Sequence, residues 1–480
     1  MTRLRSPAAS ASFGEARGPA SAKATAVRRS FSEGGSASGA EAAASPKDER
    51  RATLFGSTRD ERRATLLGST KDERRATLSA SPKSAGEPER LALHGEPKNE
   101  CRATLPGSPN RPLRIAIIAP YDLSADGGIN SQIRAQARAL RGLGHVVQIA
   151  GPASGPLQEG ELPLGGSVAV TLGGTESGLG VDPRAFGAVG RLLQQAFDVV
   201  HVHEPLTPLV PWIVLARARA PLVGTFHVHR EEGHPLYTAW AWALRPLARR
   251  LRARIAVSDA ARRTVAAHFS AEYEIVPNGI DTDTFRLPRP RPVEMPADRR
   301  IVLYVGRLEL RKGVEYLIHA MPRVQQRVRD ALLLVIGDGA DRVRLASLAA
   351  DLGAAALFSG RVADEDLPAY YQSADIVCSP ALGGESFGVV LLEAMASGTA
   401  IVASRIDGYE ALVRATEAAR LVPPGDVEAL ATEIVALLES AERRRALAEN
   451  GAALAREHDW HTLAPRLVAI YRRIIGASRE

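Results

Sequence analysis

The sequence has few of the residues from which disulfide frameworks, cysteine metal sites and membrane spans are built. Its 480 residues include only two cysteines, Cys101 and Cys378, so neither a disulfide framework nor a cysteine-based zinc site can be assembled. The N-terminus lacks the apolar core of a secretory signal, and no uninterrupted apolar run is long enough to cross a bilayer. We therefore expect a cytoplasmic protein that touches a membrane, if at all, peripherally at its inner face.

Positive charge is in excess, but the excess is confined to one end of the chain. Residues 1–111 contain 20 Lys and Arg against 13 Asp and Glu, whereas the remainder contains 41 of each class. Affinity for a phosphate backbone needs a concentrated basic surface. The neutral remainder argues against a nucleic-acid partner.

Residues 1–111 differ in composition from the rest of the chain and contain a repeated segment. The heptapeptide Asp-Glu-Arg-Arg-Ala-Thr-Leu begins at Asp48, Asp60 and Asp72. One apolar residue per repeat cannot offset the entropy lost on ordering, so we predict a disordered, low-complexity tail. Two interpretations stay open: a docking or phosphorylation segment, since Arg-Arg-Ala-Thr resembles a basophilic kinase site, or a repeat expansion without function.

From Leu113 onward, short apolar runs alternate with helical patterns in two series. The first runs from Leu113–Pro120 to Glu274–Val276, and the second from Ile301–Val305 to Arg420–Val422. The alternation predicts an α/β protein with two Rossmann-like, doubly wound domains that face a cleft. We place an N-terminal domain at residues 112–286, a C-terminal domain at 287–457 after a proline-rich connector, and a helix at 458–480 that packs back on the N-terminal domain.

Two carboxylates stand eight residues apart in the second domain. Glu385 lies in a loop that leaves a strand, Gly388 and Val389 open the following helix, and Glu393 lies one turn further in. A loop carboxylate can reach a ligand, and backbone N–H groups at a helix start can bind a phosphate. The plainer alternative is two acidic residues on a solvated helix start.

Two cations occupy the loop that follows the opening strand of the second domain. Arg307 and Lys312 flank Leu308–Arg311, and Arg311 is an alternative to Lys312. Fixed cations can stabilise the charge that develops on a diphosphate leaving group without a metal. The alternative is an ordinary solvated basic loop.

Paired glycines and a histidine mark the first domain. Gly127 and Gly128 follow the first strand and let a ligand approach the backbone, and we expect Asn130 to cap the next helix. His227 ends another strand and suits either a sugar contact or a structural role. A zinc cluster of neighbouring histidines lacks a recognisable ligand set; the histidines are His201, His203, His227, His229 and His234.

Residues 113–480 resemble retaining family-4 glycosyltransferases of the GT-B fold, and among them phosphatidylinositol mannosyltransferases. The resemblance rests on the two motifs above and on His201–Pro205, Thr225–His227, Arg254–Asp259 and Pro277–Asp281. The last match makes Asp281-Thr-Asp283 an interdomain turn rather than a metal motif. We expect no obligatory metal and no other cofactor.

The resemblance implies a role for each of these residues. Glu385 contacts the donor sugar, and Glu393 contacts the nucleotide ribose. Arg307 and Lys312 hold the diphosphate, and His227 belongs to the active site. The remaining donor-binding positions are Gly127, Gly128, Gly337, Arg361, Val362, Gly388 and Val389. It also implies GDP-mannose as donor and phosphatidylinositol as acceptor.

Three alternatives remain open at this stage. They are a UDP-sugar donor with a carbohydrate or small-molecule acceptor, a nucleotide-sugar epimerase, and a non-enzymatic scaffold. A membrane contact has its own basis in Trp240–Arg254, where aromatic residues accompany five arginines in what we expect to be a helix interrupted at Pro246. An ordinary packed helix with a basic face is the competing interpretation.

Overall fold

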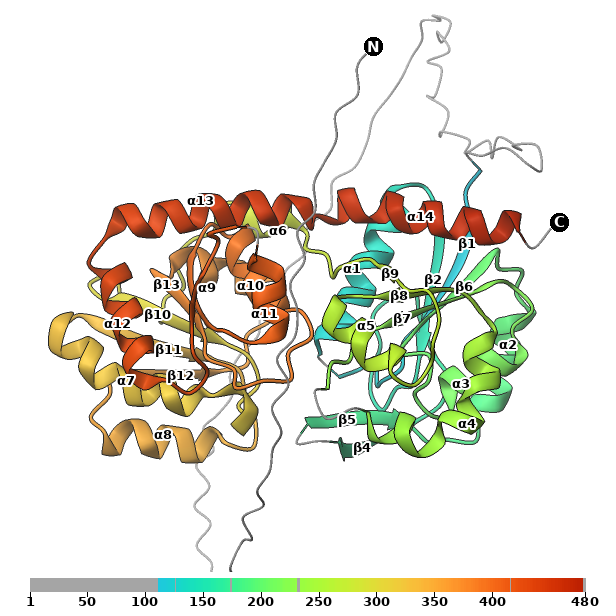
Figure 1. The fold of residues 1–480 in the computed structure, drawn as a ribbon, viewed down its shortest axis with the longest axis horizontal. Coiled ribbons are helices and arrows are strands. Elements are labelled where there is room, and N and C mark those ends of the chain that lie inside the picture. The colour runs from blue at the N-terminus through green and yellow to red at the C-terminus, as the bar shows by residue number, and fades with distance from the viewer. Residues whose placement is uncertain (1–110, 126, 173–174, 231–233, 415, 478–480) are drawn as a thin grey trace, which may run out of the picture. The chain divides into compact units, whose positions relative to one another are not determined.

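The computed structural model describes residues 111–125, 127–172, 175–230, 234–414 and 416–477 (Figure 1). Apart from Arg111, the tail that we predict to be disordered lies outside the described residues. The remainder contains two parallel sheets with helices on their faces, as the alternating sequence pattern predicts.

The first sheet is parallel throughout and has the order β3-β2-β1-β6-β7-β8-β9. Helices cover both faces, which explains the nearly continuous apolar runs of its central strands. The strands are β1 (Arg114–Ile118), β2 (Val146–Gly151), β3 (Glu161–Pro163), β6 (Val199–His203), β7 (Leu222–Phe226), β8 (Leu251–Ala256) and β9 (Glu274–Ile275). The helices of this half are α1 (Gly128–Gly142), α2 (Ala185–Gln194), α3 (Val210–Arg217), α4 (Pro235–Arg249) and α5 (Asp259–Ala266). The short α6 (Thr282–Arg286) follows them in sequence but packs against helices of the second half.

The second sheet is also parallel and has the order β12-β11-β10-β13-β14-β15. Its strands are β10 (Arg300–Val305), β11 (Ala331–Ile336), β12 (Ala356–Gly360), β13 (Ile376–Ser379), β14 (Ala400–Ser404) and β15 (Arg420–Val422). The helices are η1 (Leu310–Lys312), α7 (Val314–Arg327), α8 (Arg342–Asp351), α9 (Leu367–Ser373), α10 (Val389–Ala396), α11 (Asp407–Val413), α12 (Val427–Leu438) and α13 (Ala441–Glu457).

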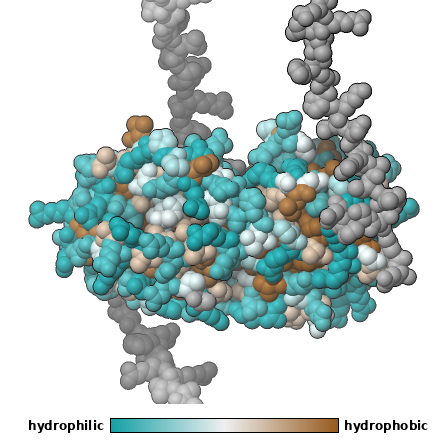
Figure 2. Space-filling model, turned by 90° about the horizontal axis from the view of Figure 1, so that it is seen from above, coloured by the Kyte–Doolittle hydropathy of each residue, from teal (hydrophilic) through white to brown (hydrophobic). Residues whose placement is uncertain are grey.

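The last helix, α14 (Trp460–Gly476), packs on the first sheet although it follows the second in sequence. Leu463, Leu467 and Ile474 share a core with β1 and α1. The Trp460 ring lies so close to Gly279 that a Cβ there would come within 2.6 Å of it. On the face that carries α13 and α14, hydrophobic residues form small patches separated by hydrophilic ones (Figure 2).

Several local predictions are wrong. The helix α1 is capped by Gly127, and Asn130 lies in its first turn, where its side chain turns back to bond loop carbonyls. Trp240–Arg254 is not one helix, because α4 ends at Arg249 and the chain enters β8 at Leu251; the helix does continue through Pro246.

Two further elements differ from the sequence interpretation. Asp281 does not form a plain turn but caps α6, accepting a hydrogen bond from Thr284 N at 3.1 Å. The antiparallel hairpin of β4 (Ser167–Leu172) and β5 (Thr175–Gly180) has no predicted counterpart.

Candidate active site

The strand order of each sheet locates the site before any side chain is considered. In an open parallel sheet, ligands bind beyond the carboxyl ends of the strands at the point where the strand order reverses. In the second sheet this point lies between β10 and β13, and in the first between β1 and β6. The loop after β10 carries Arg307 and Lys312, and the loop after β13 carries Glu385.

Five charged side chains form a chain of ion pairs at this point of the second sheet. Lys312 Nζ and Arg311 Nη1 lie 2.8 and 2.6 Å from the same atom, Glu385 Oε1. Glu309 pairs with Arg311 at 3.1 Å and with Arg307 at 2.9 Å. The cluster therefore holds three cations and two carboxylates, and it carries one net positive charge.

The ion pairs favour the ionised form of Glu385. Burial opposes the charge of Glu385, but the charges of Lys312 and Arg311 outweigh it and lower the pKa of Glu385. The side chains of Glu309, Lys312 and Glu385 are only 13–17% exposed, so solvent screens them weakly. Arg311, which the sequence offered as an alternative to Lys312, contacts the same carboxylate as Lys312.

Glycines fix the backbone of the loops that carry these charges. Gly313 ends the basic loop with φ +66°, and a Cβ there would lie 2.1 Å from the Pro380 carbonyl oxygen. Gly337 follows β11 with φ +127°, and its Cβ would lie 1.9 Å from the Gly306 oxygen. No larger residue fits at either position, so the loops after β10, β11 and β13 are held in close contact.

The other predicted donor-binding residues of this half lie at the same edge of the sheet. Gly337 N donates to Gly360 O at 2.7 Å, and Arg361 and Val362 follow directly after β12. Gly388 caps α10, which begins at Val389. The structure therefore brings these residues to the carboxyl ends of neighbouring strands, as their positions in the sequence predict.

Glu393 lies within α10 and is paired with a tyrosine. Its Oε2 accepts a hydrogen bond from Tyr371 Oη at 2.7 Å. Burial raises the pKa of Glu393 to about 7, although the bond from Tyr371 acts in the opposite direction. This carboxyl group therefore titrates near neutral pH, unlike Glu385.

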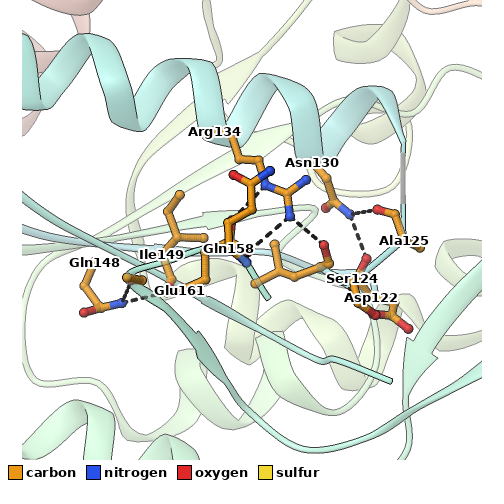
Figure 3. Close-up of polar contacts among 11 residues, drawn as sticks. Asp122, Ser124, Ala125, Asn130, Arg134, Gln148, Ile149, Gln158 and Glu161 are labelled. Carbon is orange, nitrogen blue, oxygen red and sulfur yellow. Dashed lines mark hydrogen bonds and ion pairs between the residues drawn. The ribbon is translucent and has the colours of Figure 1, made fainter. Parts of the chain in front are cut away.

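In the first half, a polar network holds the loop that leads to Gly127 and Gly128. Asn130 Nδ2 donates to the carbonyls of Asp122 and Ala125, at 2.7 and 2.9 Å (Figure 3). Arg134, one turn along α1, pairs with Glu161 on β3 at 2.8 Å and donates to the Leu123 carbonyl (Figure 3). Gly127 and Gly128 are exposed, and a Cβ at either would meet nothing within 4 Å.

Asp122 anchors the same loop from the other side. Burial opposes its charge, but the hydroxyl groups of Ser124, Ser154 and Ser167 donate to it and lower its pKa to about 2. The carboxylate therefore stays ionised at neutral pH, and it ties the loop to Ser154, which follows β2, and to Ser167, the first residue of β4.

His227 lies in a buried stack of three imidazoles at the ends of β6 and β7. Its Nε2 lies 2.8 Å from His203 Nδ1, and the two rings are stacked with centroids 5.1 Å apart. Glu204 accepts hydrogen bonds from the backbone N–H groups of His227 and Val228. Burial lowers the pKa of His227 to about 4, so its ring is neutral at pH 7.

Sequence reasoning missed several residues that hold these groups. Glu309 bridges two arginines, Tyr371 binds Glu393, and Glu204 holds the backbone at His227. Glu204 lay inside a recognised motif but had no assigned role; Tyr371 lies 22 residues from its partner, and no local pattern links the two. Within the described part of the chain, no group of three or more His, Cys, Asp or Glu is arranged to hold a metal ion.

Comparison with known proteins identifies the family of this chain. A model described as Glycosyltransferase Family 4 matches residues 126–284, and one described as Glycosyl transferases group 1 matches residues 289–454. The phosphatidyl-myo-inositol mannosyltransferase of Mycobacterium tuberculosis is 36% identical over 77% of this chain and 99% of its own length.

The chain belongs to glycosyltransferase family 4. A phosphatidyl-myo-inositol mannosyltransferase of Propionibacterium freudenreichii is 34% identical over 75% of this chain and 94% of its own length. The sucrose-phosphate synthase of Thermosynechococcus elongatus superposes with a TM-score of 0.60 over 76% of this chain and all of its own, at 24% identity. The predicted GT-B fold and glycosyltransferase activity are confirmed. Among the described residues, no helix is long and apolar enough to cross a membrane.

Proposed function

We propose that this family-4 glycosyltransferase moves mannose from GDP-mannose to a hydroxyl group of phosphatidylinositol, with retention of configuration and without an obligatory metal. The observation that carries the proposal is the cation cluster on Glu385 at the switch point of the second sheet, in a chain 36% identical to a relative named phosphatidyl-myo-inositol mannosyltransferase. Residues 112–286 would form the acceptor domain and residues 287–457 the donor domain.

The charges of the cluster suit a diphosphate. Without a ligand, Lys312 and Arg311 both pair with Glu385, and Arg307 pairs with Glu309. A diphosphate that arrives beside Lys312 and Arg307 competes for these cations and gains from the net positive charge. As the glycosidic bond breaks, the same cations stabilise the added charge on the leaving diphosphate, because they are already in place.

Glu385 has a second role in this exchange. Once the cations turn to the diphosphate, its carboxylate is released to accept hydrogen bonds from sugar hydroxyls. An ionised carboxylate has no proton to donate and serves only as an acceptor. Ribose hydroxyls would donate hydrogen bonds to Glu393. The acceptor hydroxyl attacks the anomeric carbon from the side of the leaving group, the bond from that carbon to the diphosphate breaks, and the hydroxyl proton passes to the departing diphosphate oxygen.

The first half supplies the other wall of the site in this proposal. The open space beside Gly127 and Gly128 lets the donor phosphates approach the backbone, and the Asp122 network holds that backbone still. His227 contacts the sugar or the acceptor hydroxyl. Because its ring is neutral at pH 7, it can bond an oxygen without adding charge.

Contact with a lipid surface is supported by α4. Trp240 and Trp242 on this helix are 50% and 74% exposed, and Arg245 and Arg249 are exposed as well. Indole rings favour the interface between lipid headgroups and acyl chains, and arginines favour anionic lipids. We infer that α4 holds the enzyme peripherally on the inner membrane face, where its acceptor lies.

Donor choice is tested by titrating the purified protein with GDP-mannose, UDP-glucose and UDP-N-acetylglucosamine, with Lys312→Ala and Glu385→Ala as controls. We expect selective binding of GDP-mannose and its loss in both variants. Preference for a UDP-sugar would instead indicate an enzyme of polysaccharide or small-molecule synthesis. No binding of any of the three donors would favour a non-enzymatic scaffold.

Membrane contact is tested by sedimentation with vesicles that contain phosphatidylinositol. The double variant Trp240→Ser/Trp242→Ser should lose binding by about tenfold or more, given the apolar area removed. Val293→Ser/Val343→Ser removes two apolar side chains elsewhere that are more exposed than the tryptophans, and this variant should bind as the parent does. Equal binding of both variants would exclude α4 as the contact.

A further inference from the structure

A small cavity lies beside the histidine stack, between the first sheet and the start of α14. Its volume is about 20 Å³, and its lining includes Gln132, His203, His227 and Trp460. A cavity of this size can hold one water molecule.

Two residues that line this cavity each carry a buried polar atom with no protein partner. These atoms are Trp460 Nε1 and His203 Nε2, on residues that are 6% and 2% exposed. All other buried side-chain N and O atoms of the described residues that line the cavity have partners. Leaving two such atoms unbonded is costly, and a water molecule with several polar neighbours is the usual solution.

We propose that one water molecule occupies this cavity, accepts a hydrogen bond from Trp460 Nε1–H and donates one to His203 Nε2, so that His203 is a positioning residue that sets the tautomer of His227. An indole N–H is a donor only, and imidazole Nε2 can accept. A water that bridges one donor and one acceptor satisfies both with one lone pair and one hydrogen. A water that accepted from both rings would need two further acceptors for its own hydrogens.

The proton positions then follow along the stack. With Nε2 as acceptor, neutral His203 carries its proton on Nδ1, which lies 2.8 Å from His227 Nε2. His227 Nε2 therefore accepts, and His227 carries its own proton on Nδ1. Burial lowers the pKa of His201 to about 3 and that of His227 to about 4, so at neutral pH the tautomer is the variable that the surroundings control.

The neighbouring imidazole is oriented by protein atoms rather than by water. Gln136 Nε2 donates to His201 Nδ1 at 3.0 Å, which leaves His201 Nε2–H to donate to Thr225 Oγ1 at 2.7 Å. Each ring of the stack thus has one defined tautomer. The consequence for catalysis rests on the proposed function: His227 offers an N–H to a substrate oxygen and acts as a hydrogen-bond donor rather than as a general base.

The tautomers are read directly from the ¹⁵N chemical shifts of the imidazoles in the full chain labelled at histidine, with His227 assigned from a His227→Gln variant. We expect a protonated Nδ1 and an unprotonated Nε2 for His227, and the same for His203. Trp460→Phe keeps an aromatic ring, although a smaller one, and removes the donor, so it should produce a mixture of His227 tautomers. Trp212→Phe, which loses a bond to the Leu206 carbonyl instead, should leave the shifts unchanged.

A His227 protonated on Nε2 in the parent protein, or a Trp460→Phe protein with parent shifts, overturns the proposal. If Trp460→Phe does not fold, the cavity is examined instead by neutron diffraction from crystals of the parent protein. An empty cavity would also overturn the proposal. In transfer assays Trp460→Phe should lower kcat about fivefold with an unchanged donor KM, as expected for one lost hydrogen bond. The tautomer is measured without activity, so its outcome is independent of the proposed function.

Discussion

At the residue scale, the account depends on the pairing of Lys312 and Arg311 with Glu385. Lys312→Met removes a charge that stabilises the leaving diphosphate, and we expect kcat to fall by about a hundredfold or more. Steady-state transfer assays measure this directly. Arg323→Met breaks an exposed ion pair with Glu428 and should leave kcat unchanged. Equal rates for the two variants would show that Lys312 has no part in the reaction.

We expect Glu393 to make donor binding dependent on pH. Its pKa is raised to about 7 by burial, so the carboxyl group gains a proton as the pH falls from 8 to 6 and loses acceptor capacity for ribose hydroxyls. Donor affinity should therefore fall over that range. Calorimetric titration at several pH values measures it, and Glu393→Gln should abolish this dependence; a dependence that survives in the variant would assign the titration to another group, such as Glu204.

The residues with a local signal were predictable from the sequence, and those without one were not. Arg307, Lys312 and Glu385 each follow a recognisable strand, so their place at the sheet edge could be predicted. The role of Glu309 as a bridge between two arginines could not, because it depends on the fold of a loop whose glycine, Gly313, adopts a left-handed conformation. Tyr371 reaches Glu393 only through tertiary packing.

At the scale of elements, the turn after η1 requires a glycine, because any larger residue there would clash with the backbone. A matched pair of glycine variants tests this requirement. Gly313 and Gly353 have nearly equal φ values, +66° and +63°, but only at Gly313 would a Cβ strike backbone, 2.1 Å from Pro380 O. Gly353→Ala should cost about 1–2 kcal/mol of stability and leave activity intact. Gly313→Ala should also displace the loop and abolish transfer. Chemical denaturation and transfer assays measure the two effects, and an active Gly313→Ala protein would contradict the account.

The sequence predicted the central strands well and the exceptions have physical causes. Val199–His203 and Leu222–Phe226 are buried on both faces, so their apolar runs are unambiguous. The hairpin of β4 and β5 lies outside the parallel sheet and has no such run. The helix α4 was expected to include Arg252 and Arg254, because arginine suits the solvent-facing positions of a helix and of a strand equally well.

At the scale of the molecule, the catalytic unit should be independent of residues 1–110. The described structure begins at Arg111, which pairs with Asp198, and every residue to which we assign a role in transfer follows it. A protein that starts at Arg111 should therefore match the full chain in kcat, KM and thermal stability. A large loss of activity in a folded, truncated protein would show that the tail belongs to the enzyme.

The two-domain α/β architecture was predictable because short apolar runs alternate with helical patterns over hundreds of residues. For the return of α14 to the first sheet, the structure adds the individual contacts: Trp460 packs on Gly279, and Gln136 donates a hydrogen bond to Tyr471. The bond between Gln136 and Tyr471 joins residues 335 positions apart, and the sequence alone could not identify the two partners.

The most direct test of the central claim is transfer itself. The full chain is incubated with radiolabelled GDP-mannose and vesicles that contain phosphatidylinositol, and lipid-bound mannose is measured and its anomeric configuration determined by NMR. The account predicts an α-linked mannosyl lipid with the configuration of the donor, which Lys312→Ala and Glu385→Ala do not form. A product of inverted configuration, or sugar transfer from UDP-glucose with none from GDP-mannose, would contradict it.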